Sequence, residues 1–183
     1  MKKLILILSV TIMCMVWCTP ATAVSVESNT ARSSVRYTID NDTIDSRYSN
    51  TRYGFSIYYE GSQHYNGDAR RTASANKNHR YGWVGTNFYT PKKELYVTIG
   101  MYLNSSLFTD SRTGYWSNQG IDSFLIGRKN QNTAPAGWSY MNGVLDKNYA
   151  TVEGIPLKGI DVAPSGTGSG YTGADAISVY AYD

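Results

Sequence analysis

Cysteine is nearly absent from this chain: Cys14 and Cys18 are the only two, and both lie in an apolar N-terminal segment. That segment has the features of a leader that is removed, so the chain that remains has no disulfide, thiol nucleophile or thiolate metal ligand. Small exported domains of eukaryotes are usually stapled by disulfides. An exported domain without cysteine therefore favours a bacterial source.

Residues 1–23 have the order of a secretory signal peptide. Lys2 and Lys3 precede the apolar stretch Leu4–Val16, and the small-residue triplet Ala21–Ala23 follows. This pattern predicts cleavage after Ala23 and secretion to the extracellular space. The apolar stretch is shorter than the ~20 residues of a spanning helix, and no similar run occurs later, so we predict no transmembrane anchor.

Cys18 permits a second interpretation, in which it becomes the lipid-bearing first residue of a bacterial lipoprotein. That modification requires small residues just before the cysteine, and here the large side chains of Val16 and Trp17 precede it. Ordinary cleavage after Ala23 is therefore favoured over a lipid anchor.

The chain also lacks a large excess of charge of either sign. The chain has 17 basic and 14 acidic residues; without Lys2 and Lys3, 15 basic residues remain and the formal charge is +1. Nucleic-acid binding needs a basic stripe or patch. The densest basic cluster is short, lies among polar residues and is interpreted as a solvated loop; it comprises Arg70, Arg71, Lys77, His79 and Arg80. We predict no nucleic-acid partner.

Helical periodicity is missing after the leader, whereas the two-residue period of strands recurs. The clearest case is Leu95–Leu103, where aliphatic residues alternate strictly with Tyr96, Thr98, Gly100 and Tyr102. Further strands are predicted at Val35–Asp40, Tyr53–Tyr59, Tyr81–Tyr89, Phe124–Ile126 and Ile177–Tyr182. All 16 tyrosines follow the leader, and such a composition suits half-buried strands.

Seven or so short strands separated by turns predict an all-β fold, an antiparallel β-sandwich, with a small β-barrel as the alternative. We expect residues 24–34 to form a disordered N-terminal lead and residues 35–183 to form a single domain. Tyr81–Tyr89 and Leu95–Leu103 are expected to pair as a hairpin, with Thr86 opposite Thr98. The polar segment Gly61–Asn78 is interpreted as a loop or a weak edge strand.

No motif of reactive chemistry stands out. His64 and His79 are the only histidines, they match no zinc or catalytic spacing, and both are expected to be exposed in a loop. No serine occupies a nucleophile elbow, and the run Ser165–Gly170 lacks the strand and helix of a phosphate-binding loop. A glycosidase needs two facing carboxylates, and the sequence cannot pair its candidates, which are Glu60, Asp68, Glu94, Asp122 and Glu153. We predict a protein that is not an enzyme and has no cofactor.

Asp40, Asp42 and Asp45, with Asn41 between them, place several oxygen atoms close together. Calcium prefers such hard oxygen ligands, but the spacing is not that of a helix-loop-helix calcium site. An ordinary turn stabilised by these side chains is the favoured interpretation.

A candidate ligand site consists of aromatic residues in segments that are rich in turns: Tyr115, Trp116, Trp138 and Tyr140, with Asn142 as a hydrogen-bond partner. Sugar sites use such rings as stacking platforms. The competing interpretation is that the rings cap the ends of the core.

These observations favour a secreted, non-enzymatic binding or surface-interaction protein that recognises a glycan or a cell-envelope polymer. The alternative is a secreted antibacterial or membrane-active toxin, in which the hairpin of Tyr81–Leu103 inserts into a bilayer, because barrel strands also alternate. A secreted hydrolase is the second alternative.

Overall fold

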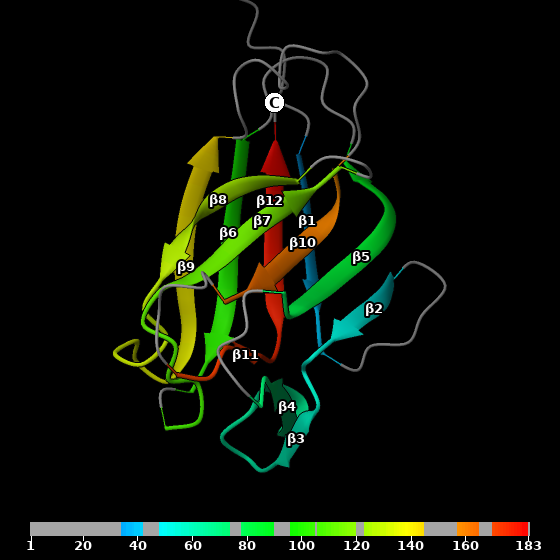
Figure 1. The fold of residues 1–183 in the computed structure, drawn as a ribbon. Coiled ribbons are helices and arrows are strands. Elements are labelled where there is room, and N and C mark those ends of the chain that lie inside the picture. The colour runs from blue at the N-terminus through cyan, green and yellow to red at the C-terminus, as the bar shows by residue number, and fades with distance from the viewer. Residues whose placement is uncertain are drawn as a thin grey trace, which may run out of the picture. The chain divides into compact units, whose positions relative to one another are not determined.

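Two antiparallel sheets pack face to face and form a β-sandwich (Figure 1). The four-stranded sheet has the order β1 (Ser34–Ile39), β12 (Ile177–Tyr182), β6 (Tyr96–Leu103) and β9 (Gly137–Val144). The five-stranded sheet has the order β2 (Tyr48–Tyr53), β5 (Arg80–Tyr89), β10 (Leu157–Ala163), β7 (Thr113–Asn118) and β8 (Ser123–Lys129). Both sheets of described strands are open, so the predicted sandwich is confirmed and the small barrel is not formed.

The computed structural model describes residues 34–41, 48–73, 78–89, 96–104, 106–119, 123–144, 157–164 and 170–182; for 48–51, 85–89 and 142–144 it describes the backbone alone. All of these residues belong to one compact unit, residues 31–183. The predicted signal peptide, residues 1–23, lies outside the described residues, as does the predicted lead except for Ser34. Ser34 is already part of β1.

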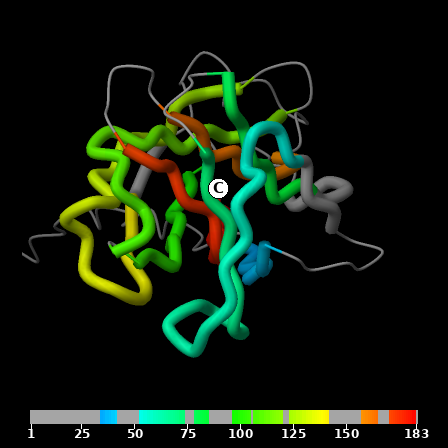
Figure 2. Tube along the Cα trace, turned by 60° about the horizontal axis from the view of Figure 1, so that its bottom comes forward, coloured from blue at the N-terminus to red at the C-terminus, as the bar shows by residue number. Residues whose placement is uncertain are grey.

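A third, smaller sheet lies at one end of the sandwich. It has the order β11 (Gly173–Ala174), β4 (Asp68–Arg71) and β3 (Ile57–Glu60), and a single 3₁₀ turn, η1 (Tyr65–Gly67), connects β3 to β4. Figure 2, turned so that this end comes forward, shows the segment of β3 and β4 extending from it. Since β11 continues through Asp175 into β12, the small sheet is joined directly to the centre of the four-stranded sheet.

Alternation of side chains explains the two central strands of the four-stranded sheet. Val97, Ile99, Met101 and Leu103 of β6 are buried, as the sequence predicts, and the residues between them lie on the outer face. β12 repeats the pattern, with its odd-numbered residues buried and its even-numbered residues partly exposed. Because successive residues of a strand point to opposite faces, one apolar face per strand supplies half of the core.

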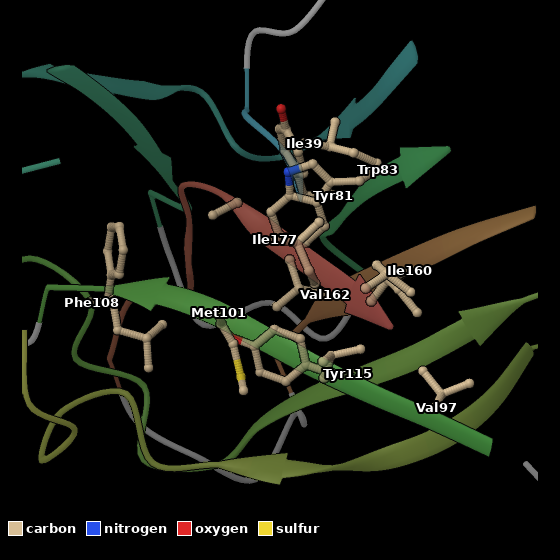
Figure 3. Close-up of a cluster of buried hydrophobic side chains, with 14 of the residues drawn as sticks. Ile39, Tyr81, Trp83, Val97, Met101, Phe108, Tyr115, Ile160, Val162 and Ile177 are labelled. Carbon is tan, nitrogen blue, oxygen red and sulfur yellow. The ribbon is translucent and has the colours of Figure 1, made fainter. Parts of the chain in front are cut away.

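The core lies between the sheets (Figure 3). The five-stranded sheet contributes large rings, including Tyr81, Trp83 and Tyr115, which face aliphatic residues of β6 and β12. A buried phenol needs a hydrogen-bond partner. The Tyr81 hydroxyl donates to the Asn41 carbonyl, and the Tyr115 hydroxyl accepts a 2.8 Å hydrogen bond from the Gln131 amide.

The predicted hairpin of Tyr81–Tyr89 with Leu95–Leu103 is wrong. β5 pairs with β2 and β10, whereas β6 pairs with β12 and β9, so the two segments lie in different sheets. An alternating pattern shows only that each strand has a buried face. Two consecutive strands have the same pattern whether they pair in one sheet or face each other across the core. The membrane-inserting hairpin of the toxin hypothesis therefore has no counterpart in this fold.

The segment from Tyr53 to Asn78 also differs from the prediction. Tyr53 and Tyr59 do not share one strand, because Gly54, at φ +77°, ends β2 in a conformation that favours glycine. The polar stretch that follows contains β4, the central strand of the small sheet, and it buries Ala69 and Thr72. Its burial depends on partners far away in the sequence, such as the strand β11.

The remaining elements follow the sequence in part. The predicted strand Phe124–Ile126 lies within β8, and Ile177–Tyr182 is confirmed as the terminal strand. The segment of Tyr115 and Trp116, interpreted as rich in turns, forms the strand β7. The part of the chain that the structure describes contains no helix with the length and apolar character needed to cross a lipid bilayer.

The strand pairing can be tested by disulfide cross-linking. Thr98 lies directly opposite Tyr180 in the β6–β12 pair, where Cα atoms are about 5 Å apart. In a chain that starts at Val24 and has no other cysteine, we expect Thr98→Cys with Tyr180→Cys to form a disulfide on mild oxidation. Thiol titration and the mobility of tryptic peptides measure it.

The matched control combines Thr98→Cys with Thr86→Cys, the pair that the predicted hairpin would join. We expect both thiols to remain free in this variant. A disulfide in the control and none in the first pair would contradict the sheet order.

Candidate functional site

The outer face of the four-stranded sheet carries a series of aromatic side chains. Cross-strand partners share a face, and the register places Tyr96 opposite Tyr182, Gly100 opposite Tyr140, and Tyr102 opposite Trp138. Together with a tyrosine of η1 they form what we call the aromatic face: Tyr65, Tyr96, Tyr102, Trp138, Tyr140, Tyr180 and Tyr182. None of these rings belongs to the core, because the inner positions of the same strands are aliphatic or small.

One group of rings lies near the C-terminal end of β12. Tyr96 stacks on Tyr182 with ring centroids 5.3 Å apart, and Tyr180 stacks on Tyr182 at 5.1 Å. The guanidinium of Arg36, from the edge strand β1, lies over the Tyr180 ring at 5.1 Å from its centroid. This is the distance of a cation–π contact. The group therefore offers flat apolar surface beside one positive charge.

A second group lies at the opposite end of β6. Tyr65, Tyr102 and Trp138 contact one another edge to face, with centroid distances of 5.4 to 5.7 Å. Along β6 the two groups are separated by six residues, Tyr96 to Tyr102, or about 20 Å at ~3.4 Å per residue. The aromatic face is therefore long compared with a single sugar ring.

Tyr140 lies between the groups and is the most accessible of these rings, with 63% of its surface exposed. Its position depends on Gly100: a β-carbon at Gly100 would lie 2.8 Å from Cε1 of Tyr140 and 3.2 Å from Cε3 of Trp138. Without that atom, the Tyr140 ring can lie against the backbone of the neighbouring strand. The edge of the ring with Cε1 and Cδ1 lies next to Gly100, and most of the side chain remains exposed.

The structure brings together only some of the predicted site residues. Trp138 and Tyr140 lie on the aromatic face, and the backbone of Asn142 pairs with Thr98 on the same sheet. Tyr115 and Trp116 lie in β7 of the five-stranded sheet. Tyr115 is buried in the core, and Trp116 is on the outside of that sheet with its ring over Gly114. All five are in strands, not in turns as the sequence suggested.

Sequence reasoning missed most of the aromatic face. Its overlooked members are Tyr65, Tyr96, Tyr102, Tyr180 and Tyr182. Four of them are visible as a signal in the alternation itself, because they occupy the outer positions of β6 and β12, where solvent-facing strands usually carry polar residues. Tyr65 has no such signal, since it reaches the face from η1.

Of the three candidate calcium ligands, the structure describes Asp40 alone. Asp40 is buried and its Oδ1 accepts a 2.8 Å hydrogen bond from the backbone N–H of Asn41, the next residue. Asp42 and Asp45 lie outside the described residues. Among the residues that are described, no three histidine, cysteine or carboxylate side chains are grouped so as to hold a metal ion.

Two of the carboxylates considered for hydrolysis face each other in the small sheet. Glu60 lies opposite Asp68 in the β3–β4 pair. Glu60 is exposed, whereas Asp68 is buried and accepts a 3.3 Å hydrogen bond from the Tyr58 hydroxyl. Glu94, Asp122 and Glu153 lie outside the described residues.

His64 was expected to be exposed, and this expectation is wrong. Its side chain is fully buried, and Nδ1 lies 3.2 Å from Oδ2 of Asp175, which is equally buried. The two oxygens of Asp175 also accept the backbone N–H of Tyr65 at 3.2 and 3.3 Å. Asp175 therefore anchors η1 and holds the Tyr65 ring against Tyr102 and Trp138. His79, by contrast, is partly exposed, and its ring contacts Tyr53.

Burial raises the pKa of Asp175 to about 8, and the nearby carboxylates of Asp40 and Asp68 act in the same direction, whereas the backbone N–H groups of Tyr65 and Ala176 oppose it. Burial lowers the pKa of His64, and the charge of Asp68 partly offsets that effect. Both shifts favour the uncharged forms of two groups that water cannot reach.

No protein-family model matches this chain, and no curated protein matches it with significance. Among solved structures, a family 29 carbohydrate-binding module from Piromyces equi is 10% identical, with 82% of this chain and 88% of that chain covered and a TM-score of 0.43. The K1 cleaved adhesin domain of Lys-gingipain from Porphyromonas gingivalis W83 is 7% identical, with coverages of 81% and 98% and a TM-score of 0.45.

The placement of Tyr140 can be tested by NMR. An aromatic ring beside Gly100 displaces the resonances of its α-protons through the ring current, so we expect these resonances to depart from ordinary values in the wild type and to move toward them in Tyr140→Ala. The control is Tyr53→Ala, which removes an equally exposed tyrosine from the other sheet. It should leave the Gly100 resonances unchanged; a Gly100 signal insensitive to Tyr140 would contradict the geometry.

The buried pair predicts a particular dependence of stability on pH. The pKa of Asp175 rises from 3.8 in the unfolded chain to about 8 in the folded protein, so its stabilising contribution is complete below 3.8 and is lost as the pH rises toward 8. The lowered pKa of His64 changes the stability in the opposite direction, and it does so only below pH 6.5, the pKa of this group in the unfolded chain. From pH 6.5 to 8 the Asp175 effect remains, and the free energy of unfolding should fall by up to ~1.4 kcal/mol per pH unit.

Urea titrations across this pH range measure the decline. In Asp175→Asn, which cannot ionise, we expect the decline to be much smaller. Glu60→Gln removes an exposed carboxylate and should retain the full decline. Equal slopes in the wild type and in Asp175→Asn would show that Asp175 is already ionised at pH 6.5.

Proposed function

We propose that this protein is a non-enzymatic glycan-binding module that acts outside the cell, and that its binding site is the aromatic face. The observation that carries the proposal is Tyr140, whose ring lies beside Gly100 on the outer face of the sheet with most of its surface exposed. Sugars have apolar faces of C–H groups that stack on flat aromatic rings, and an exposed ring of this kind is a platform for such a contact.

The surroundings of Tyr140 fit the same ligand. Trp138 is partly exposed beside it, and Tyr102 and Tyr65 support the Trp138 ring from the sides. Tyrosine and tryptophan combine a large apolar surface with a polar group, which suits a ligand that has both C–H faces and hydroxyls. Thr98 and Ser178 provide hydroxyls between the ring groups.

A site on strands also has a physical advantage. The rings project from neighbouring strands of one hydrogen-bonded sheet, so their spacing is fixed by the register and does not depend on loop conformation. The export predicted from Lys2, Lys3 and the apolar stretch Leu4–Val16 would deliver such a module to the place where polysaccharides of cell envelopes are found.

Alanine substitutions on the two sheets test the proposal. We expect the purified wild type to bind some members of a broad set of plant, fungal and bacterial polysaccharides in affinity electrophoresis. Tyr140→Ala and Trp138→Ala should each weaken that binding about five- to tenfold, since loss of one ring contact is worth ~1–1.4 kcal/mol. Isothermal titration gives the affinity for the best polysaccharide.

Trp116→Ala is the matched control, because it removes an aromatic ring from the outside of the opposite sheet. Its affinity should equal that of the wild type, and circular dichroism should show all three variants folded. Absence of binding to every polysaccharide, or equal losses in Trp116→Ala and Trp138→Ala, would refute the aromatic face as a glycan site.

A further inference from the structure

Among the outward residues of the four-stranded sheet whose side chains the structure describes, Arg36 alone is charged. These residues are Ser34, Arg36, Thr38, Tyr96, Thr98, Gly100, Tyr102, Trp138, Tyr140, Ser178, Tyr180 and Tyr182. A described surface with one cation and no carboxylate favours a ligand with negative charge.

Arg36 is an exposed cation beside the aromatic rings. Its guanidinium carbon lies over the Tyr180 ring, 5.1 Å from the centroid. The planar fork of N–H donors on a guanidinium matches the two oxygens of a carboxylate. Among the described residues no carboxylate forms an ion pair with Arg36.

The distance between Arg36 and Tyr140 determines the size of the ligand. Arg36 lies opposite Tyr180 on β1, and Tyr140 lies on β9, so three strand spacings and one step of two residues separate them. At ~4.8 Å per strand and ~3.4 Å per residue this is about 16 Å. A single sugar cannot contact both residues, whereas an oligosaccharide lying obliquely across β12 and β6 can.

We infer that the ligand is an acidic polysaccharide, with one sugar stacked on Tyr140 and the carboxylate of another sugar, several units away, paired with Arg36. This inference rests on the proposed glycan-binding function and adds the charge and the length of the ligand. Tyr180 and Thr98 lie between the two contacts, whereas Tyr182 lies on the other side of Arg36 along the strands.

The experiment compares polygalacturonate with its carboxyl-reduced form, a neutral polymer that has the same length and linkage. We expect the purified protein to bind the acidic polymer more tightly by about three- to tenfold at low salt, since an exposed charge pair contributes modestly and is screened by salt. Among size-fractionated galacturonate fragments, the monosaccharide should bind too weakly to measure, and affinity should rise with length until the fragment spans both contacts.

Arg36→Gln should abolish the preference for the acidic polymer and leave the affinity for the neutral polymer unchanged, and Arg36→Lys should retain part of the preference. The matched control, Arg128→Gln, removes the same charge from an exposed position of the five-stranded sheet and should keep the preference in full. Circular dichroism verifies that each variant is folded.

Three outcomes would overturn the inference. Equal binding of the acidic and neutral polymers, or a preference that survives in Arg36→Gln, would contradict the inferred pairing of a ligand carboxylate with Arg36. Maximal affinity for the monosaccharide would contradict the inferred length of the ligand. If the protein binds neutral glycans without preferring the acidic polymer, and Tyr140→Ala abolishes that binding, only this inference fails. If it binds no glycan of either kind, the proposed function fails as well.

Discussion

The packing of β6 is the constraint on which the rest of this structure depends. The strand lies in the middle of the four-stranded sheet, and its four inward side chains are 0 to 1% exposed, so any shift of register by one residue would move aliphatic groups into water. At ~1.5–3 kcal/mol for each large apolar side chain, such a shift is prohibitive. Burial of Val97 and Ile99 thereby fixes Tyr96 and Tyr102 on the outside, and the partners of β6 take their faces from it. The aromatic face is a consequence of the core as much as a site in its own right.

Tyrosine has two distinct roles in this chain, one in the core and one on the surface. In the five-stranded sheet, Tyr81 and Tyr115 face inward, and each hydroxyl has a hydrogen-bond partner at the edge of the core. Burial raises the pKa of both phenols, because it penalises the charged form. In the two central strands of the four-stranded sheet, β6 and β12, the inward residues are aliphatic or small and the tyrosines face outward, whereas Tyr37 of the edge strand β1 packs against the core. Large rings on one side of the core are complemented by small side chains on the other, as close packing requires.

Features that depend on interactions between residues close in the sequence could be predicted, and features that depend on distant residues could not. Alternation within one strand is local, so the inward faces of β6 and β12 and the all-β fold were predictable. Pairing of β5 with β10 and burial of His64 by Asp175, 111 residues away, depend on contacts that no local pattern encodes. The predicted site residues show the same limit. Trp138 and Tyr140 were identified because they are aromatic residues in a polar segment. Tyr115 was grouped with them because a core ring and a surface ring cannot be distinguished in the sequence. The outward tyrosines of β6 could have been identified by the same alternation that located its core face.

The arrangement of the rings bears on the kind of ligand that the face can hold. Tyr96, Tyr180 and Tyr182 support one another, as do Tyr65, Tyr102 and Trp138, so little side-chain freedom remains to be lost when a ligand binds. The same contacts cover part of each ring, and every single platform is therefore small. We therefore expect these platforms, which are pre-organised but small and spread over ~20 Å, to bind one sugar weakly and an extended polymer better, because several of them then act on the same molecule. In the proposed site, the buried Asp175, which holds Tyr65 in its group through η1, would contribute to the affinity without touching the ligand.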